Sequence, residues 1–157
     1  IVKGVNVPVI VKEVGYGMHE VTLKQLISVG VKYIDISGTG GTDFTKIESR
    51  RSKVEASALG SFGLSTVESL LLAKKVNATI FASGGVTNGV DVVKALALGA
   101  KAVGMARFFL DTAYLDDEAA REKVDNLIAE IKKTMVLLNA LRPSLLNDKH
   151  IFKSTLV

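Results

Sequence analysis

Residues 82–91, "ASGGVTNGVD", place two adjacent glycines between an apolar run and a helical pattern. Because glycine lacks a Cβ, the backbone amides of Gly84 and Gly85 could approach an anion closely, at the positive end of the following helix. A plain turn between a strand and a helix also favours glycine. One strand later, "GMAR" ends in Arg107, which could hold the same anion. Together the two segments favour a phosphate site.

A second candidate is Lys12, which ends the otherwise apolar run "VIVK". A lysine at the end of a buried strand is costly unless it has a partner. That partner is either an anionic or electron-rich ligand, or a salt bridge to Glu13 or a neighbouring carboxylate. Asp35, within "YIDIS", would likewise need a partner if it faced the interior of a barrel, where it could equally serve stability.

The segment "SGTGGTDF" offers the hydroxyls of Ser37, Thr39 and Thr42 among three glycines. Hydroxyls and free amides suit the polar edge of a flat ring cofactor or a second phosphate, although a flexible glycine loop has the same composition. No Gly-Lys-Ser/Thr follows, which excludes a Walker A loop. Asp43 stands where the dinucleotide motif would need its third glycine.

Short apolar runs and helical patterns alternate along the chain, which predicts parallel βα units. Gly30 and Gly99 are suited to end two of the helices, and Ser65 with Glu68 has the spacing of a capping box. A longer amphipathic helix is predicted over residues 117–139. The predicted strands are residues 7–14, 32–37, 78–83 and 102–106.

An internal repeat indicates which α/β fold this is. "SVGVKYIDIS" and "ALGAKAVGMA" share the same helix end, glycine, lysine and strand, and their glycines, Gly30 and Gly99, lie 69 positions apart. That period is close to two βα units and predicts half of a (β/α)₈ barrel, whose full form takes about 250 residues. The chemistry of such barrels lies beyond the carboxyl ends of the strands, where all the candidates above fall. The long connection, residues 38–65, is expected to be a functional loop.

Composition excludes several classes of function. The net charge of +4 is scattered, without the basic, aromatic-containing stripe of a nucleic-acid-binding protein. No apolar run approaches the roughly 20 residues of a membrane span. The absence of cysteine fits a cytoplasmic protein. His19 and His150 are isolated, lack metal-ligand spacing and are expected at the surface. Because the chain begins at Ile1, we expect it to be part of a longer protein.

Three segments carry a resemblance to a known family: "PVIVKEVGYGM" (residues 8–18), "IDISGTGGTDFTKIESRR" (34–51) and "ASGGVTNGVDVVKALALGAKAVGMAR" (82–107). In this order and spacing they resemble the type 2, FMN-dependent isopentenyl-diphosphate isomerases, over about residues 7–139. The third segment alone would also suit other FMN barrels, such as the 2-hydroxy-acid oxidases. The first two are more specific.

The resemblance implies a role for each of these loops. Lys12 would lie against the flavin ring, and Ser37 and Thr42 would hydrogen-bond the FMN. Glu48, in the long connection, would belong to the proton-transfer machinery. The residues implied in binding the FMN phosphate are Gly84, Gly85, Val86, Thr87, Ala106 and Arg107.

The family interconverts isopentenyl and dimethylallyl diphosphate with reduced FMN and Mg²⁺. The resemblance implies the same substrates here, NADPH as flavin reductant, a Mg²⁺ ligand outside this chain and a homo-oligomer. Two residues depart from the family pattern: Phe62 replaces a tryptophan, and Asp43 replaces an asparagine.

Two alternatives stay open. One is another FMN-dependent barrel oxidoreductase, although "GVTNG" offers neither the histidine nor the arginine that such an enzyme would place there. The other is a catalytically inert half-barrel with at most a residual phosphate site, whose open strand edges and apolar face would favour pairing with another copy.

Overall fold

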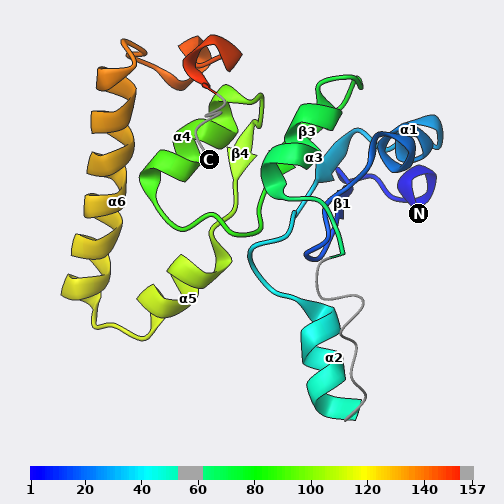
Figure 1. Ribbon diagram of the computed structural model, residues 1–157, viewed down its shortest axis with the longest axis horizontal. Coiled ribbons are helices and arrows are strands. Elements are labelled where there is room, and N and C mark those ends of the chain that lie inside the picture. The colour runs from blue at the N-terminus through cyan, green and yellow to red at the C-terminus, as the bar shows by residue number, and fades with distance from the viewer. Residues whose placement is uncertain (53–61, 153–157) are drawn as a thin grey trace.

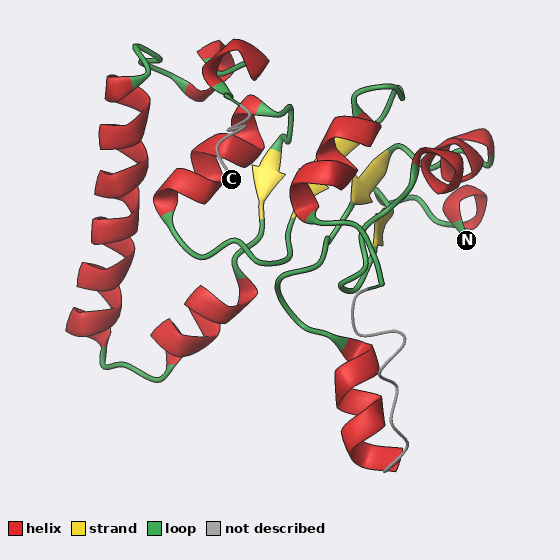
Figure 2. Ribbon diagram, in the orientation of Figure 1, coloured by secondary structure: helices red, strands yellow, loops and turns green. Residues whose placement is uncertain are grey.

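The computed structural model describes residues 1–52 and 62–152 and contains one sheet of four parallel strands in the order β1-β2-β3-β4 (Figure 2). Each strand neighbours the next one along the chain, as consecutive βα units of a barrel require. The predicted α/β fold with four parallel units is therefore confirmed. The strands are β1 (Ile10–Lys12), β2 (Tyr33–Asp35), β3 (Thr79–Ala82) and β4 (Ala102–Val103).

The helices connect these strands and extend the fold at its carboxyl end (Figure 1). Their bounds are α1 (Glu20–Ser28), α2 (Phe44–Ser52), α3 (Thr66–Ala73), α4 (Gly89–Ala97), α5 (Ala106–Ala113) and α6 (Asp117–Leu137), with short 3₁₀ helices η1 (Val2–Gly4), η3 (Pro143–Leu145) and η4 (Asp148–His150). α6 lies beside α4, and α2 projects away from the sheet.

The two faces of the sheet have different roles. Ile34 and Ile80 are register partners on β2 and β3, and they are buried with Leu23 of α1 and Leu70 of α3 in the main hydrophobic core. Alternate residues point the other way. That second face carries the Lys12–Asp35 register pair and stays more open to solvent, since Lys12 has 52% of its side chain exposed.

The predicted helix signals are confirmed at their positions. Gly30 (φ +97°) and Gly99 (φ +106°) follow α1 and α4 in the left-handed region that glycine tolerates. Ser65 and Glu68 form the reciprocal capping box of α3. The Ser65 hydroxyl donates to the Glu68 carboxylate and lowers its pKa below the usual range. This contribution to stability is present at neutral pH and is lost as the pH falls through the lowered value.

Three boundary predictions are wrong. The strands pair over two to four residues, because their ends leave the sheet to form the loops of the site. The strand predicted over 102–106 stops early, since Ala106 already begins α5, whose N-cap residue Met105 supplies no side-chain cap that a sequence pattern could reveal. Part of the predicted 38–65 loop is the polar helix α2, begun by the Asp43 side chain, which accepts from the Lys46 N–H. The remainder, 53–61, lies outside the described residues.

Candidate functional site

Three side chains meet where β1, β2 and β3 end. Lys12 Nζ donates to Asp35 Oδ2 (2.8 Å) and to Ser83 Oγ (2.9 Å). Ser83 Oγ also lies 2.8 and 3.0 Å from the two carboxylate oxygens of Asp35. This network decides the question about Lys12: its carboxylate partner is Asp35.

Glu13, the other candidate partner for Lys12, has a different role. Its Oε2 accepts hydrogen bonds from the backbone N–H groups of Gly15 (2.5 Å), Tyr16 (2.7 Å) and Gly17 (3.1 Å). One carboxylate therefore shapes the turn after β1, which leaves Lys12 to Asp35.

The loop after β2 lies against this turn. Ser37 is buried, and its N–H donates to Asp35 Oδ1 (3.2 Å). Thr42 is exposed and lines a cavity of about 330 Å³. The other residues around the cavity come from the β1 turn, the glycine loop, the start of α2 and the segment before α3: Gly15, Tyr16, Thr39, Gly40, Gly41, Asp43, Lys46, Phe62 and Gly63. Thr42 thus faces a hollow of ligand size, whereas Ser37 belongs to the Asp35 network.

Asp43 and Tyr16 join the start of α2 to the β1 turn. The Tyr16 hydroxyl accepts from the Thr45 N–H (2.7 Å) and also contacts the Thr45 side chain. The N–H of Lys46 donates to Asp43 and lowers the pKa of that carboxyl below its usual range. Asp43 is therefore an anionic helix cap at the rim of the cavity.

Gly84 and Gly85 make a left-handed turn after β3, with φ of +90° and +73°. A Cβ on Gly84 would overlap the carbonyl oxygen of Gly38, and one on Gly85 would lie 3.0 Å from Gly40 Cα. The glycines are thus required because two loop backbones pack directly together. The turn itself therefore needs glycine, with or without a phosphate.

Thr66, the first residue of α3, was not singled out from the sequence. Its buried Oγ1 lies 2.9 Å from the carbonyl oxygen of Ser83 and 2.6 Å from that of Gly84. The N–H of Gly38 donates to the same Ser83 carbonyl (3.1 Å). Since these partners come from other βα units, the only available signal was a hydroxyl directly after a helix cap.

Replacing Thr66 by valine should destabilise the β3 turn, because Val keeps the shape of Thr but cannot donate to the two carbonyls. The expected loss in the free energy of unfolding is about 1–3 kcal/mol, the scale of a buried unsatisfied polar group. Urea unfolding measures it. Thr66→Ser, which keeps the hydroxyl, is the matched control, and an equal loss in both variants would contradict the role of this hydrogen bond.

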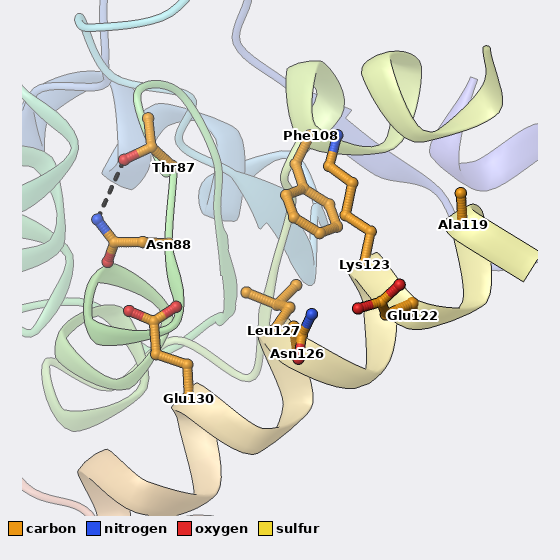
Figure 3. Close-up of a pocket in the computed structure, with 9 residues that line it drawn as sticks. All are labelled: Thr87, Asn88, Phe108, Ala119, Glu122, Lys123, Asn126, Leu127 and Glu130. Atoms are coloured by element: carbon orange, nitrogen blue, oxygen red, sulfur yellow. Dashed lines mark hydrogen bonds between the residues drawn. The ribbon is translucent and has the colours of Figure 1, made fainter. Parts of the chain in front are cut away.

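In the first turn of α4, the amides of Gly89 and Asp91 already have protein acceptors. Asn88 caps the helix by accepting from the N–H of Asp91 (2.9 Å), and the Thr87 hydroxyl donates to the Asp91 carboxylate (3.0 Å). The N–H of Gly89 donates to Glu130 of α6 (2.8 Å). Figure 3 shows Thr87, Asn88 and Glu130 beside a cavity of about 350 Å³ between the loop before α4, α5 and α6. Val86 is half-buried in the same loop.

The first turn of α5 is different. The N-cap Met105 makes no side-chain hydrogen bond to the helix, so the amides of Ala106 and Arg107 are not capped by it. Arg107 is exposed, and no ion pair or hydrogen bond of its side chain occurs within the described part of the chain. Because Ala82 pairs with Val103, this turn leaves the sheet beside the Gly84–Gly85 turn. The structure thus places the two predicted phosphate segments at one edge.

Glu48 is the predicted residue that the structure does not bring to the strand ends. It lies on α2, which projects away from the sheet (Figure 1). Its side chain is exposed next to Arg51, with 3.8 Å between the charged groups.

His19 is exposed and caps α1, whereas His150 is half-buried and caps η4. Within residues 1–52 and 62–152, no three acidic or histidine side chains gather as metal ligands.

Comparison with known proteins assigns the family. A model of the FMN-dependent dehydrogenases matches residues 1–153. The chain belongs to the FMN-dependent dehydrogenase family. Among curated relatives, the chain is 51% identical over 144 residues to the isopentenyl-diphosphate delta-isomerase of Staphylococcus haemolyticus, and 44% over 155 residues to that of Staphylococcus aureus strain Newman. The alignments cover 89% and 96% of this chain but only 41% and 44% of those proteins, so the chain spans less than half of their length.

Solved structures agree on the fold. The (S)-mandelate dehydrogenase from Pseudomonas putida superposes with a TM-score of 0.70 at 22% identity, over 92% of this chain and 37% of that one. A flavocytochrome b2 mutant with pyruvate bound gives 0.72 at 24% identity, over 98% and 37%. These flavoenzymes are (β/α)₈ barrels, and this family member supplies about half of such a barrel. In its described part, no helix has both the length and the apolar character to span a bilayer.

Proposed function

We propose that this chain contributes the flavin-binding part of an enzyme that interconverts isopentenyl and dimethylallyl diphosphate. The single observation that carries the proposal is the convergence of its sequence motifs, Lys12, the Thr42 loop and Arg107, at the carboxyl edge of one parallel sheet. The supporting comparison is the 44–51% identity to proteins named isopentenyl-diphosphate delta-isomerase.

The groups at this edge match FMN in charge and in hydrogen-bonding capacity. The uncapped first turn of α5 offers Ala106 and Arg107 to a phosphate, since helix amides and a guanidinium are its preferred partners. Gly84, Gly85, Val86 and Thr87 border the same place from β3. Lys12 and Thr42 lie toward β1 and β2, where an ammonium and a hydroxyl suit the polar edge of a flat ring.

Each of these residues has a defined task in the proposed site. Arg107 and the neighbouring amides bind the phosphate, Thr42 donates a hydrogen bond, and Lys12 faces the ring. Ser37, whose amide donates to Asp35, is the second proposed hydrogen-bond partner of the FMN. Reduced FMN would supply the electron-rich ring beside which a proton is added to one carbon of the substrate and removed from another, and Glu48 is the proposed protein group in that exchange.

Mg²⁺ and NADPH complete the proposal without residues of this chain. On the family resemblance, we assign the Mg²⁺ ligand to a part of the enzyme outside this chain. NADPH is the proposed reductant of the flavin. A cytoplasmic homo-oligomer is proposed on the same resemblance, with neither nucleic acid nor membrane as partner.

A hybrid protein tests this function. This chain replaces its aligned segment in the S. haemolyticus relative, and the hybrid is assayed for FMN content and for diphosphate isomerisation with NADPH and Mg²⁺. We expect FMN to bind and both isomers to interconvert. If the hybrid binds FMN but does not isomerise, while the unmodified relative does, the isomerase assignment is wrong. Oxidation of a 2-hydroxy acid by the hybrid would favour the dehydrogenase alternative that the family name suggests.

Arg107→Met should weaken FMN binding to the hybrid about 10- to 100-fold. Charge-assisted hydrogen bonds contribute about 1.5–3 kcal/mol, and each 1.4 kcal/mol is a tenfold change in Kd. Fluorescence titration with FMN measures the change. Arg121→Met removes the same charge from the exposed face of α6 and should leave Kd unaltered. Equal weakening by both substitutions would show a general charge effect and no phosphate contact at Arg107.

A further inference from the structure

We propose that Asp35 and Ser83 are positioning residues that fix the Lys12 ammonium against the flavin ring. The inference rests on the proposed FMN site. It concerns two side chains that the motif comparison did not assign, and it starts from the hydrogen-bonded triad at the ends of three neighbouring strands.

Register brings the triad together. Lys12 and Asp35 are direct partners across β1 and β2, and Asp35 pairs with Phe81 on β3. Ser83 is two residues beyond Phe81 and therefore points to the same face. Each of the three strands thus contributes one residue of the triad at its carboxyl end, and the register of the sheet fixes how the three residues align.

The hydroxyl of Ser83 has an orienting function that the ion pair alone would lack. A serine hydroxyl has one donor and two acceptor sites. Here it is close enough to donate to the Asp35 carboxylate and accept from Lys12, so both charged groups are bonded to the same oxygen. A lysine has four rotatable bonds, and a lone carboxylate would hold its ammonium less closely.

Two members of the triad are largely buried, whereas the third, Lys12, is exposed where a ligand could reach it. Asp35 has 15% of its side chain exposed and Ser83 is buried, whereas Lys12 has 52% exposed. An ammonium has three donors, and the two bonds within the triad leave its third N–H for another acceptor. The Asp35 carboxylate and the Ser83 hydroxyl therefore hold the Lys12 ammonium by two hydrogen bonds, while its remaining N–H stays accessible on the open face of the sheet.

The test measures the preference of the hybrid protein for reduced over oxidised FMN. Reduced FMN carries the greater negative charge on its ring, so a fixed ammonium favours it, whereas the phosphate contacts are common to both forms. Ser83→Ala changes no charge and should lower this preference about tenfold, the scale of one charge-assisted hydrogen bond. The two Kd values come from aerobic and anaerobic titrations with FMN.

A double-mutant cycle separates positioning from general damage. In a Lys12→Met background, Ser83→Ala should change the preference less than twofold, because the ammonium through which Ser83 acts is gone. Ser83→Thr keeps the hydroxyl and should restore the preference. Ser69→Ala removes another buried serine hydroxyl, one that accepts from the Met18 N–H, and should have no effect on the preference.

The role of Asp35 needs a different measurement, because removing its negative charge would itself change the preference for reduced FMN. Asp35→Asn removes the ion pair that holds the Lys12 ammonium. It should therefore increase the rate at which acetic anhydride acetylates Lys12 several-fold in the FMN-free hybrid. Mass spectrometry follows this rate. Lys101, exposed at the other end of the sheet, is the internal reference and should react at an unchanged rate.

The outcomes distinguish the two proposals. A tenfold Ser83 effect that disappears with Lys12→Met supports the positioning role. The same effect in both backgrounds, or an unchanged acetylation rate in Asp35→Asn, overturns it while the isomerase assignment stands on the hybrid's own activity. If the hybrid containing Lys12 and Ser83 binds no FMN in either form, the flavin site and this inference both fail.

Discussion

Glu48→Gln should lower kcat for diphosphate isomerisation by roughly 100- to 10,000-fold, the contribution of a general acid or base. The amide has nearly the shape of the carboxyl group but cannot take up or release the proton. The measurement is the initial rate of the hybrid protein with saturating reduced FMN and Mg²⁺. Because α2 does not form the proposed phosphate site, the Kd for FMN should stay within about twofold.

Glu122→Gln is the matched control for this charge change, since Glu122 is an exposed glutamate on α6. It should leave kcat unaltered. Glu48→Asp adds a second readout, because shortening the side chain by one methylene group preserves the acid but moves it. A Glu48→Gln enzyme that keeps its full rate would assign proton transfer to another residue, and it would fit the position of α2 away from the strand ends.

The parts of the fold that the sequence predicted are those fixed by local chemistry. Gly30 and Gly99 end helices in the left-handed region, and Ser65 with Glu68 caps α3, each at the expected residue. These signals depend on neighbours within a few positions, so no tertiary information is needed. The alternation of strand and helix, and with it the parallel sheet, followed from the short apolar runs and the helical patterns between them.

The errors have a common physical origin. α2 is mostly polar, and its two apolar residues, Phe44 and Ile47, make too short a stripe to distinguish it from a loop. It is fixed by Asp43 and by Tyr16 from another βα unit. α5 begins at Ala106 without a side-chain cap. For α2 only the Asp43 cap is local, whereas Tyr16 comes from another βα unit, and for α5 no side-chain cap exists for the sequence to reveal.

In the candidate site, too, one part was predictable from the sequence and another part depends on contacts between distant residues. The barrel rule placed Lys12, Thr42 and Arg107 at one edge from strand order alone. It could not choose between Asp35 and Glu13 as the partner of Lys12, because that choice depends on register and on the three amides that occupy Glu13. Ser83 and Thr66 were not assigned roles, since small hydroxyl residues are common at strand ends and only their distant partners make them informative.

Gly84→Ala is the second substitution with a large expected effect, and it separates two reasons for a glycine. At φ +90° any side chain is strained, by about 1–3 kcal/mol. In addition, the new Cβ would overlap the Gly38 carbonyl oxygen, which belongs to the backbone and cannot rotate away. We expect the free energy of unfolding of the hybrid to fall by at least about 3 kcal/mol and FMN binding to weaken at least tenfold.

Gly99→Ala is a matched control for the conformational part of this loss. Gly99 has a φ of +106°, yet a Cβ there would meet nothing within 4 Å. It should cost only about 1 kcal/mol and leave FMN binding intact. Urea unfolding and FMN titration of both variants therefore isolate the contact between the β2 and β3 loops. Equal losses would mean that Gly84 serves only the turn, whereas the expected difference would show that the same glycine packs the two loops that border the proposed phosphate site.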